Sequence, residues 1–191
     1  QLEIAAPALD GMLYVLKRDG TNLSGWPRAL ENKWGALTPA VALHDFDGDG
    51  RLELVAASTG AVTDQGKLYM FDAAGNVQAG WPVDLHTASE ASPLIGDLDG
   101  DGVPEIVFGG ESGILYGFRP DGGPFPGFPI RVGAEVRATP LIIDADMDGL
   151  TELLFSGWDQ QVYLWHFPGL FVRRHVPWGA LKGNLLRNGV Y

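Results

Sequence analysis

Three short segments of the chain carry carboxylates at the same spacing. Each places acidic residues at positions 1, 3, 5 and 9 and a glycine at position 6, in residues 45–53, 97–105 and 144–152. Ca²⁺ is a hard cation that takes six to eight oxygen ligands, and alternating Asp residues in a tight loop can direct several carboxylates at one ion. Asp and Gly are also common in ordinary turns. Three copies with the same position-9 Glu favour calcium over solvated turns.

We call these segments the first, second and third acidic loops. Each is predicted to bind one Ca²⁺ through four side chains and the backbone carbonyl at position 7. The predicted ligands are Asp45, Asp47, Asp49, Arg51 and Glu53 in the first loop; Asp97, Asp99, Asp101, Val103 and Glu105 in the second; and Asp144, Asp146, Asp148, Leu150 and Glu152 in the third. The third loop has Met147 where the others have Gly, so we expect weaker binding there.

The flanks of the loops predict strands. An EF-hand needs a bidentate Glu at position 12 and helices on both sides, whereas here position 9 is the last acid. Runs rich in Val, Ile, Leu and Phe, bounded by Gly and Pro, precede and follow every loop, as in β-strands. The sequence therefore predicts an all-β fold with the loops between antiparallel strands.

The loops belong to a longer repeat. The first Asp recurs after 52 and then 47 residues, and each unit offers four strand-like segments, the fourth at a Gly-aromatic-Pro element in the units of the first two loops. Four antiparallel strands in 40–50 residues are typical of a β-propeller blade. The predicted division is a partial blade at 1–34, blades at 35–85, 86–133 and 134–176, the last taking its fourth strand from residues 171–176, and a tail at 177–191.

The first unit is incomplete, because Glu3 occupies the position of a ninth loop residue and no Asp precedes it. We expect no complete metal site there. The chain offers about four blades, while propellers close with four to eight. We therefore expect it to be part of a larger propeller, completed by upstream blades or by a second copy in a homodimer. A degenerate first blade and a four-bladed ring are the alternatives.

The Asp-Gly-Asp-Gly loops at residues 47–50 and 99–102, each followed by a Glu and a hydrophobic strand, resemble FG-GAP or VCBS-type repeats, the calcium-binding blades of integrin alpha-subunit propellers. The resemblance covers roughly residues 1–168, and the Gly-Trp-Pro elements look like those of secreted bacterial members. It implies a secreted or cell-surface location, extracellular or periplasmic, and a binding or scaffold role. Some bacterial polysaccharide lyases use a related propeller for catalysis, so the fold alone does not settle function.

The composition excludes several classes of function. The formal net charge is −11, and three bound Ca²⁺ would bring it to −5. No Lys/Arg cluster exists to neutralise phosphates, which argues against nucleic acid. The chain has no cysteine, so disulfides and thiolate metal sites are absent. No signal peptide and no apolar run long enough to span a membrane is recognisable.

No motif for a catalytic nucleophile, phosphate binding or zinc hydrolysis is present, so we expect a module that binds a protein or carbohydrate partner. His44 is interpreted as a packing residue, and His86 as a less favoured functional candidate. Trp26, Trp81 and Phe128 recur at one blade position, which favours packing between blades over sugar stacking. Trp158 is the better candidate for exposure. The alternatives are a secreted polysaccharide lyase or hydrolase, and a propeller half that only assembles.

Overall fold

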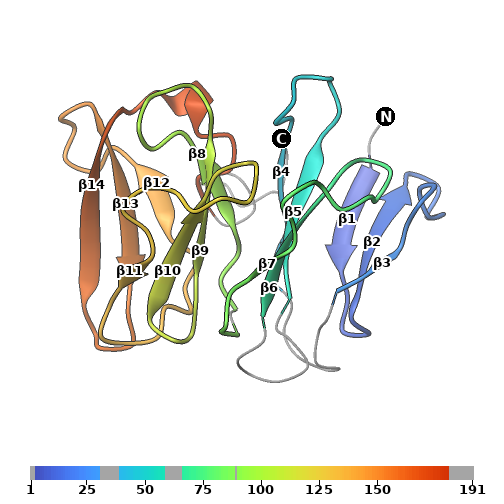
Figure 1. Ribbon diagram of the computed structural model, residues 1–191, viewed down its shortest axis with the longest axis horizontal. Coiled ribbons are helices and arrows are strands. Elements are labelled where there is room, and N and C mark those ends of the chain that lie inside the picture. The colour runs from blue at the N-terminus through green and yellow to red at the C-terminus, as the bar shows by residue number, and fades with distance from the viewer. Residues whose placement is uncertain (1–2, 31–38, 59–65, 89, 181–191) are drawn as a thin grey trace.

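The computed structural model describes residues 3–30, 39–58, 66–88 and 90–180. In these residues fourteen strands form four separate antiparallel sheets, and a single 3-10 turn is the only helical element described. The sheets stand side by side along the long axis of the molecule (Figure 1). The expectation of an all-β fold built from antiparallel strands is confirmed. No helix in the described ranges is long and apolar enough to cross a membrane.

Two sheets have four strands in meander order. One contains β4 (Ala42–His44), β5 (Glu53–Ala57), β6 (Lys67–Phe71) and β7 (Val83–Asp84), and the next contains β8 (Leu94–Gly96), β9 (Glu105–Gly109), β10 (Ile114–Phe118) and β11 (Ile130–Arg131). In both, an acidic loop joins the first strand to the second. Strands β5 and β9 are buried along their whole length, because they lie in the middle of a sheet with neighbouring sheets on its faces.

The first and last sheets have three strands each. The first contains β1 (Glu3–Pro7), β2 (Met12–Lys17) and β3 (Arg28–Ala29), in line with the predicted partial unit. The last contains β12 (Leu141–Ile143), β13 (Leu150–Ser156) and β14 (Val162–Leu170). The fourth strand predicted at residues 171–176 is wrong, since this segment instead forms the 3-10 turn η1 (Arg173–His175).

The missing strand has a cause in the sequence. In the two complete sheets a Gly-containing turn follows the third strand, at residues 72–76 and 119–123, and reverses the chain. After Trp165 the chain continues as His-Phe-Pro-Gly-Leu without such a turn. The strand therefore runs on for nine residues to Leu170. Pro168 is tolerated in it because β14 is an edge strand, where one missing N–H breaks no ladder bond.

The Gly-aromatic-Pro elements connect neighbouring sheets. The buried indoles of Trp26 and Trp81 donate hydrogen bonds to the carbonyls of Ala73 (3.1 Å) and Pro120 (2.8 Å), each in the turn after the third strand of the following sheet. The X-Pro peptide bond is cis in all three Gly-aromatic-Pro elements, at Trp26–Pro27, Trp81–Pro82 and Phe128–Pro129. A Cβ added to Gly80 would lie 1.9 Å from a backbone oxygen of that neighbouring turn. The repeated aromatic is thus a packing element between sheets, as expected.

The segment after η1 packs between the first strands of two sheets. Trp178 is buried and exchanges two backbone hydrogen bonds with Ile95 of β8, while the carbonyl of Gly179 accepts from the N–H of Ile142 in β12. Strand β8 also contacts both β4 and β12. Residues 177–180 therefore belong to the packed interior. The predicted boundary at 34/35 and the rest of the predicted tail, 181–191, lie outside the described residues.

Candidate metal centres

All three acidic loops lie at the same end of the sheets, at the top in Figure 1. Each is the hairpin connection between the first and second strand of its sheet. The position-9 glutamates Glu53, Glu105 and Glu152 stand on the outgoing strands and are at most 5% exposed, whereas most of the loop aspartates are exposed. Each loop thus has one buried carboxylate, from its position-9 glutamate, and further carboxylates that are mostly exposed to solvent.

The structure brings together at least three predicted ligands in each loop. The carboxylate oxygens in each group lie within 4.8 Å of one another: Asp45, Asp47 and Glu53; Asp97, Asp99 and Asp101; and Asp144, Asp146, Asp148 and Glu152. This separation fits one ion, because Ca–O distances are about 2.4 Å and two opposite ligands are twice that far apart. Asp49 and Glu105 fall outside these groups, and the carbonyl ligands Arg51, Val103 and Leu150 stay predictions.

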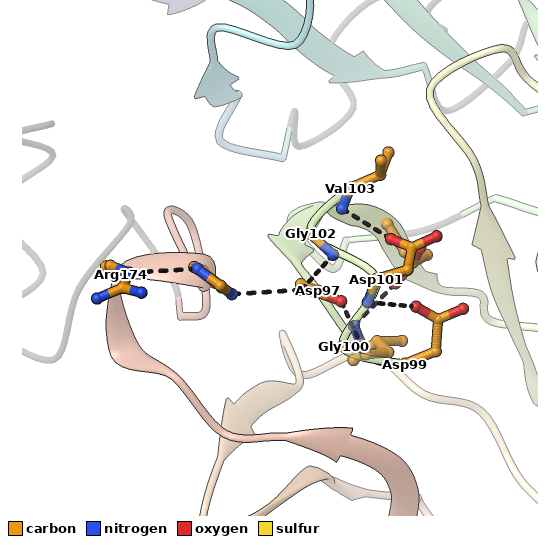
Figure 2. Close-up of polar contacts among 10 residues, drawn as sticks. Asp97, Asp99, Gly100, Asp101, Gly102, Val103 and Arg174 are labelled. Carbon is orange, nitrogen blue, oxygen red and sulfur yellow. Dashed lines mark hydrogen bonds and ion pairs between the residues drawn. The ribbon is translucent and has the colours of Figure 1, made fainter.

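Hydrogen bonds within each loop hold the carboxylates in place. In the second loop, Asp97 accepts the N–H groups of Gly100 (Oδ1, 2.7 Å) and Gly102 (Oδ2, 2.9 Å), and Asp101 accepts that of Val103 (2.7 Å), as Figure 2 shows. Glu105 accepts the N–H of Leu98 at 2.8 Å. The first loop has the same bonds from Gly48, Gly50, Arg51 and Phe46. Side chains that bond their own backbone fix such turns, so the ligand geometry does not require an ion to form.

In the first two loops the pKa of the buried glutamate is raised, which would favour a bound cation. Burial, together with the negative charges of the neighbouring aspartates, raises the pKa of Glu105 to about 8. Burial likewise raises the pKa of Glu53. Both shifts arise because a carboxylate is costly in a poorly solvated site beside other negative charges. A divalent cation at the loop would remove this cost, since ligand binding to carboxylates and deprotonation are coupled.

Two histidines near the loops were not among the predicted ligands. His166 of β14 is paired with Glu152 of β13, and its Nδ1 lies 3.4 Å from Glu152 Oε1. One of its ring nitrogens also groups with Asp146 and Asp148 within 4.8 Å. His175 of η1 places Nδ1 at 3.4 Å from Asp97 Oδ2. Aligning the repeats could have found His166, because it directly follows the third-strand motif; His175 carried no such signal, since η1 lies outside the repeat.

The other candidates lie away from the acidic loops. Trp158 is 68% exposed at the opposite end of β13, and the guanidinium carbon of Arg137 lies 4.8 Å from its ring centre. Arg137 pairs closely with Glu135 (2.8 Å) and more loosely with Glu90 and Glu111. His86 is exposed with a φ of 51°. His44 packs edge-on against Phe46 at 4.9 Å, and burial lowers its pKa.

The fold of this chain is similar to that of several solved structures. Two crystal structures of BBS1N in complex with ARL6DN, one soaked with mercury and one with lead, superpose with a TM-score of 0.56 at 12% and 16% identity. They cover 89% and 88% of this chain, which spans half of those chains. The V. cholerae biofilm matrix protein Bap1 gives a TM-score of 0.55 at 18% identity, over 84% of this chain and 26% of its own. Identities this low show the fold alone.

No curated protein sequence matches the chain. The family of FG-GAP-like repeats matches residues 45–108, a stretch that begins at the first acidic loop and ends in β9 beyond the second. Residues 45–108 are therefore an FG-GAP-like repeat segment, and the resemblance inferred from the loops is confirmed there.

Proposed function

We propose that this chain is a calcium-stabilised part of a β-propeller that serves as an extracellular binding or scaffold module. The observation that carries the proposal is the recurrence of one acidic loop, with clustered carboxylates, at the same end of three successive sheets. Every loop joins the first two strands of its sheet, so an ion there would hold both strands and the turn between them. Its role is to stabilise the fold, because carboxylates fill most positions around such an ion.

The sheets have the arrangement that propeller blades need. Each is an antiparallel meander, the first strand β8 lies between the first strands β4 and β12 of its two neighbouring sheets, and buried aromatic side chains join adjacent sheets. Radial packing of this kind leaves an open face on the first and last blade. On the last blade this is visible in β14, where Val162 and Leu164, two residues apart and so on the same face of the strand, are 72% and 40% exposed. We propose that further blades, or a second copy of the chain, cover these faces.

The partner-binding surface that we propose lies at the end opposite the acidic loops. Trp158 is held over Arg137, which is itself fixed by Glu135, so a large aromatic ring is both exposed and restrained. Rigid, exposed Trp and Arg residues are typical of protein interfaces and of aromatic platforms for other ligands. Structures of similar fold include a complex between two proteins and a biofilm matrix protein, which is compatible with a protein or carbohydrate partner outside the cell.

The metal part of the proposal is tested by calcium titration with native mass spectrometry. We expect three Ca²⁺ per chain, and two per chain for Asp99→Ala. An unchanged stoichiometry in that variant would show that the second loop is not a calcium site. The mass of the calcium-loaded species also tests ring completion: a dimer supports two half-rings, whereas a monomer leaves a four-bladed ring or blades from elsewhere in the parent protein.

The binding part is tested by screening immobilised glycans and candidate proteins with the wild-type chain and Trp158→Ala. Loss of a specific interaction in the variant, at unchanged calcium stoichiometry, would support the surface. An interaction that survives Trp158→Ala would place it elsewhere. Turnover of an acidic polysaccharide by the wild-type chain would instead favour the lyase alternative.

A further inference from the structure

We propose that the third acidic loop and His166 together form a mixed oxygen and nitrogen site that takes a divalent transition metal ion, such as Zn²⁺ or Ni²⁺. The first two loops keep sites made of oxygen alone. This inference rests on the proposed function to the extent that the loops are cation sites, and it adds that one of them differs in ligand chemistry. The difference comes from another strand, because His166 lies on β14 and not in the loop.

The imidazole lies close enough to join the loop carboxylates. His166 is opposite Glu152 in the β13–β14 pairing, and its Nδ1 is 3.4 Å from Glu152 Oε1. A ring nitrogen of His166 lies within 4.8 Å of carboxylate oxygens of Asp146 and Asp148, which themselves group with Asp144 and Glu152. The ring is 52% exposed, so an ion can reach it from solvent.

Two buried carboxylate oxygens at this loop accept no hydrogen bond. Glu152 is completely buried, and while its Oε2 accepts the N–H of Ala145 at 2.7 Å, its Oε1 has no donor. Asp144 Oδ1 is likewise buried without one. Among the residues that the structure describes, no carboxylate oxygen of the other two loops is in this state. A buried acceptor without a partner is destabilising, and a bound cation would satisfy both oxygens.

The unpaired oxygen of Asp144 results from a difference inside the loop. In the first two loops the N–H of the position-4 glycine donates to the position-1 carboxylate, at 2.8 Å and 2.7 Å. In the third loop Met147 occupies that position, with φ of 63°, and no such bond forms. Asp144 keeps only a weak bond from Gly149, at 3.2 Å. Its other oxygen is therefore available to an ion.

The contact between His166 Nδ1 and Glu152 Oε1 leaves room for a cation bound by both atoms. At 3.4 Å, Nδ1 and Oε1 are farther apart than in an ordinary N–H···O bond, which spans about 2.7–3.2 Å. A ring with its lone pair on Nδ1 could share an ion with Oε1, whereas a ring with a proton on Nδ1 would donate only a long hydrogen bond to it.

The choice of metal follows from the imidazole. Ca²⁺ takes oxygen ligands, whereas imidazole nitrogen suits Zn²⁺, Ni²⁺ and other first-row transition metals. At the same position in the two preceding repeats, directly after the third-strand motif, the residues are Asp72 and Arg119. Neither offers a nitrogen that can coordinate a metal near neutral pH, so only the third loop gains a ligand of this type from its third strand.

His175 provides a matched control. Its Nδ1 is also 3.4 Å from a loop carboxylate, Asp97 Oδ2, but that oxygen already accepts the N–H of Gly102 at 2.9 Å. The other nitrogen of His175 lies 3.3 Å from Nε of Arg174, as Figure 2 shows. His175 does not group with Asp97, Asp99 and Asp101 as a ligand. The same substitution can thus be made at two histidines that contact acidic loops.

The test is a titration with Co²⁺, whose visible absorption reports ligand type, in excess Ca²⁺. Wild type and His175→Gln are expected to bind one Co²⁺ per chain, displaced by Zn²⁺ or Ni²⁺, with paramagnetically shifted imidazole proton signals. His166→Gln should lose those signals and bind Co²⁺ at least about tenfold more weakly. The inference is overturned if wild type binds no Co²⁺ in excess Ca²⁺, or if His166→Gln binds it as wild type does.

Calcium stoichiometry separates this inference from the proposed function. If His166→Gln and wild type both bind Ca²⁺ when no other metal is present, the proposed calcium role stands whichever way the Co²⁺ result falls. If neither binds Ca²⁺, the proposed function fails, while a Co²⁺ site that depends on His166 would still support the mixed site. Circular dichroism of the variants shows whether each one folds.

Discussion

The second and third acidic loops show how two copies of one motif can differ in their surroundings. The second is covered: Asp97 is 2% exposed, its N–H donates to the carbonyl of His175, and the N–H of Gly169 donates to Leu98. The third is open, with Met147 89% exposed and His166 beside it. The motif determines where the carboxylates lie. The segments of the same chain that pack beside each loop determine its exposure to solvent and any ligand from outside the motif.

Residues 169–171 physically connect these two loops. Gly169 packs on the second loop, and the N–H of Phe171 donates to the carbonyl of Gly149 in the third at 2.9 Å. A Cβ at Gly169 would lie 2.4 Å from the carbonyl oxygen of Leu98, so only glycine allows this approach. One short segment of chain therefore contacts both loops.

The largest expected effect comes from removing the metal. With a chelator, each loop keeps at least three carboxylates close together, and the repulsion should lower the thermal unfolding temperature by several degrees or more. Amide hydrogen exchange should become faster at the second and third loops, and more so at the second, where burial amplifies the repulsion. Calorimetry with and without chelator measures the change in thermal unfolding temperature. Equal stability in both conditions would mean that neither loop depends on a cation.

The next largest effect is the loss of stability when the position-1 aspartate of the second or the third loop is replaced. Asp97→Ala should destabilise the chain by about 1–3 kcal/mol, because it leaves the N–H groups of Gly100 and Gly102 without their acceptor. Asp144→Ala should cost less, since Asp144 holds only one weak bond within its loop. Urea unfolding in chelator measures both without the metal contribution. A larger loss for Asp144→Ala would show that the open loop contributes more to stability than the covered one.

The pH dependence sharpens the comparison at the second loop. Because the pKa of Glu105 is raised to about 8 in the folded chain, the folded state holds this proton more tightly than the unfolded state does. In metal-free protein the free energy of unfolding should therefore fall as pH rises from about 4.5 to 8. Urea unfolding across this range checks the slope. Glu105→Gln should flatten it, and an unchanged slope would assign it to other groups.

The smallest effects concern position 4 of the loops. Gly100→Ala should cost about 1–2 kcal/mol for its left-handed backbone at φ of 82°, and its Cβ would also lie 3.2 Å from Gly169 Cα. Met147→Gly should change stability by less than about 1 kcal/mol, because relief of the same backbone conformation is offset by the greater flexibility of glycine when unfolded. Thermal melts of both variants measure the contrast, and similar shifts would mean that the close approach of Gly169 does not matter.

Sequence reasoning predicted the local features well, because they depend on short stretches of chain. The spacing of Asp47, Gly50 and Glu53 and its repetition specify the loop, and the alternation of apolar residues around it specifies strands. The extra strand predicted at 171–176 is wrong, because no Gly-containing turn follows Trp165 and the third strand therefore continues to Leu170. The packing role of Trp26 and Trp81 was predicted correctly from their repetition.

What the sequence alone determined is the set of carboxylates, their order around each turn and the antiparallel sheets on which they stand. Those features follow from hydrogen bonds and side-chain periodicity within about ten residues. Only the tertiary structure decided that His166 lies against Glu152, that His175 and Gly169 cover the second loop, and that Arg137 supports Trp158. These contacts join residues from different strands or different sheets, and their distances depend on how the strands and sheets pack against one another.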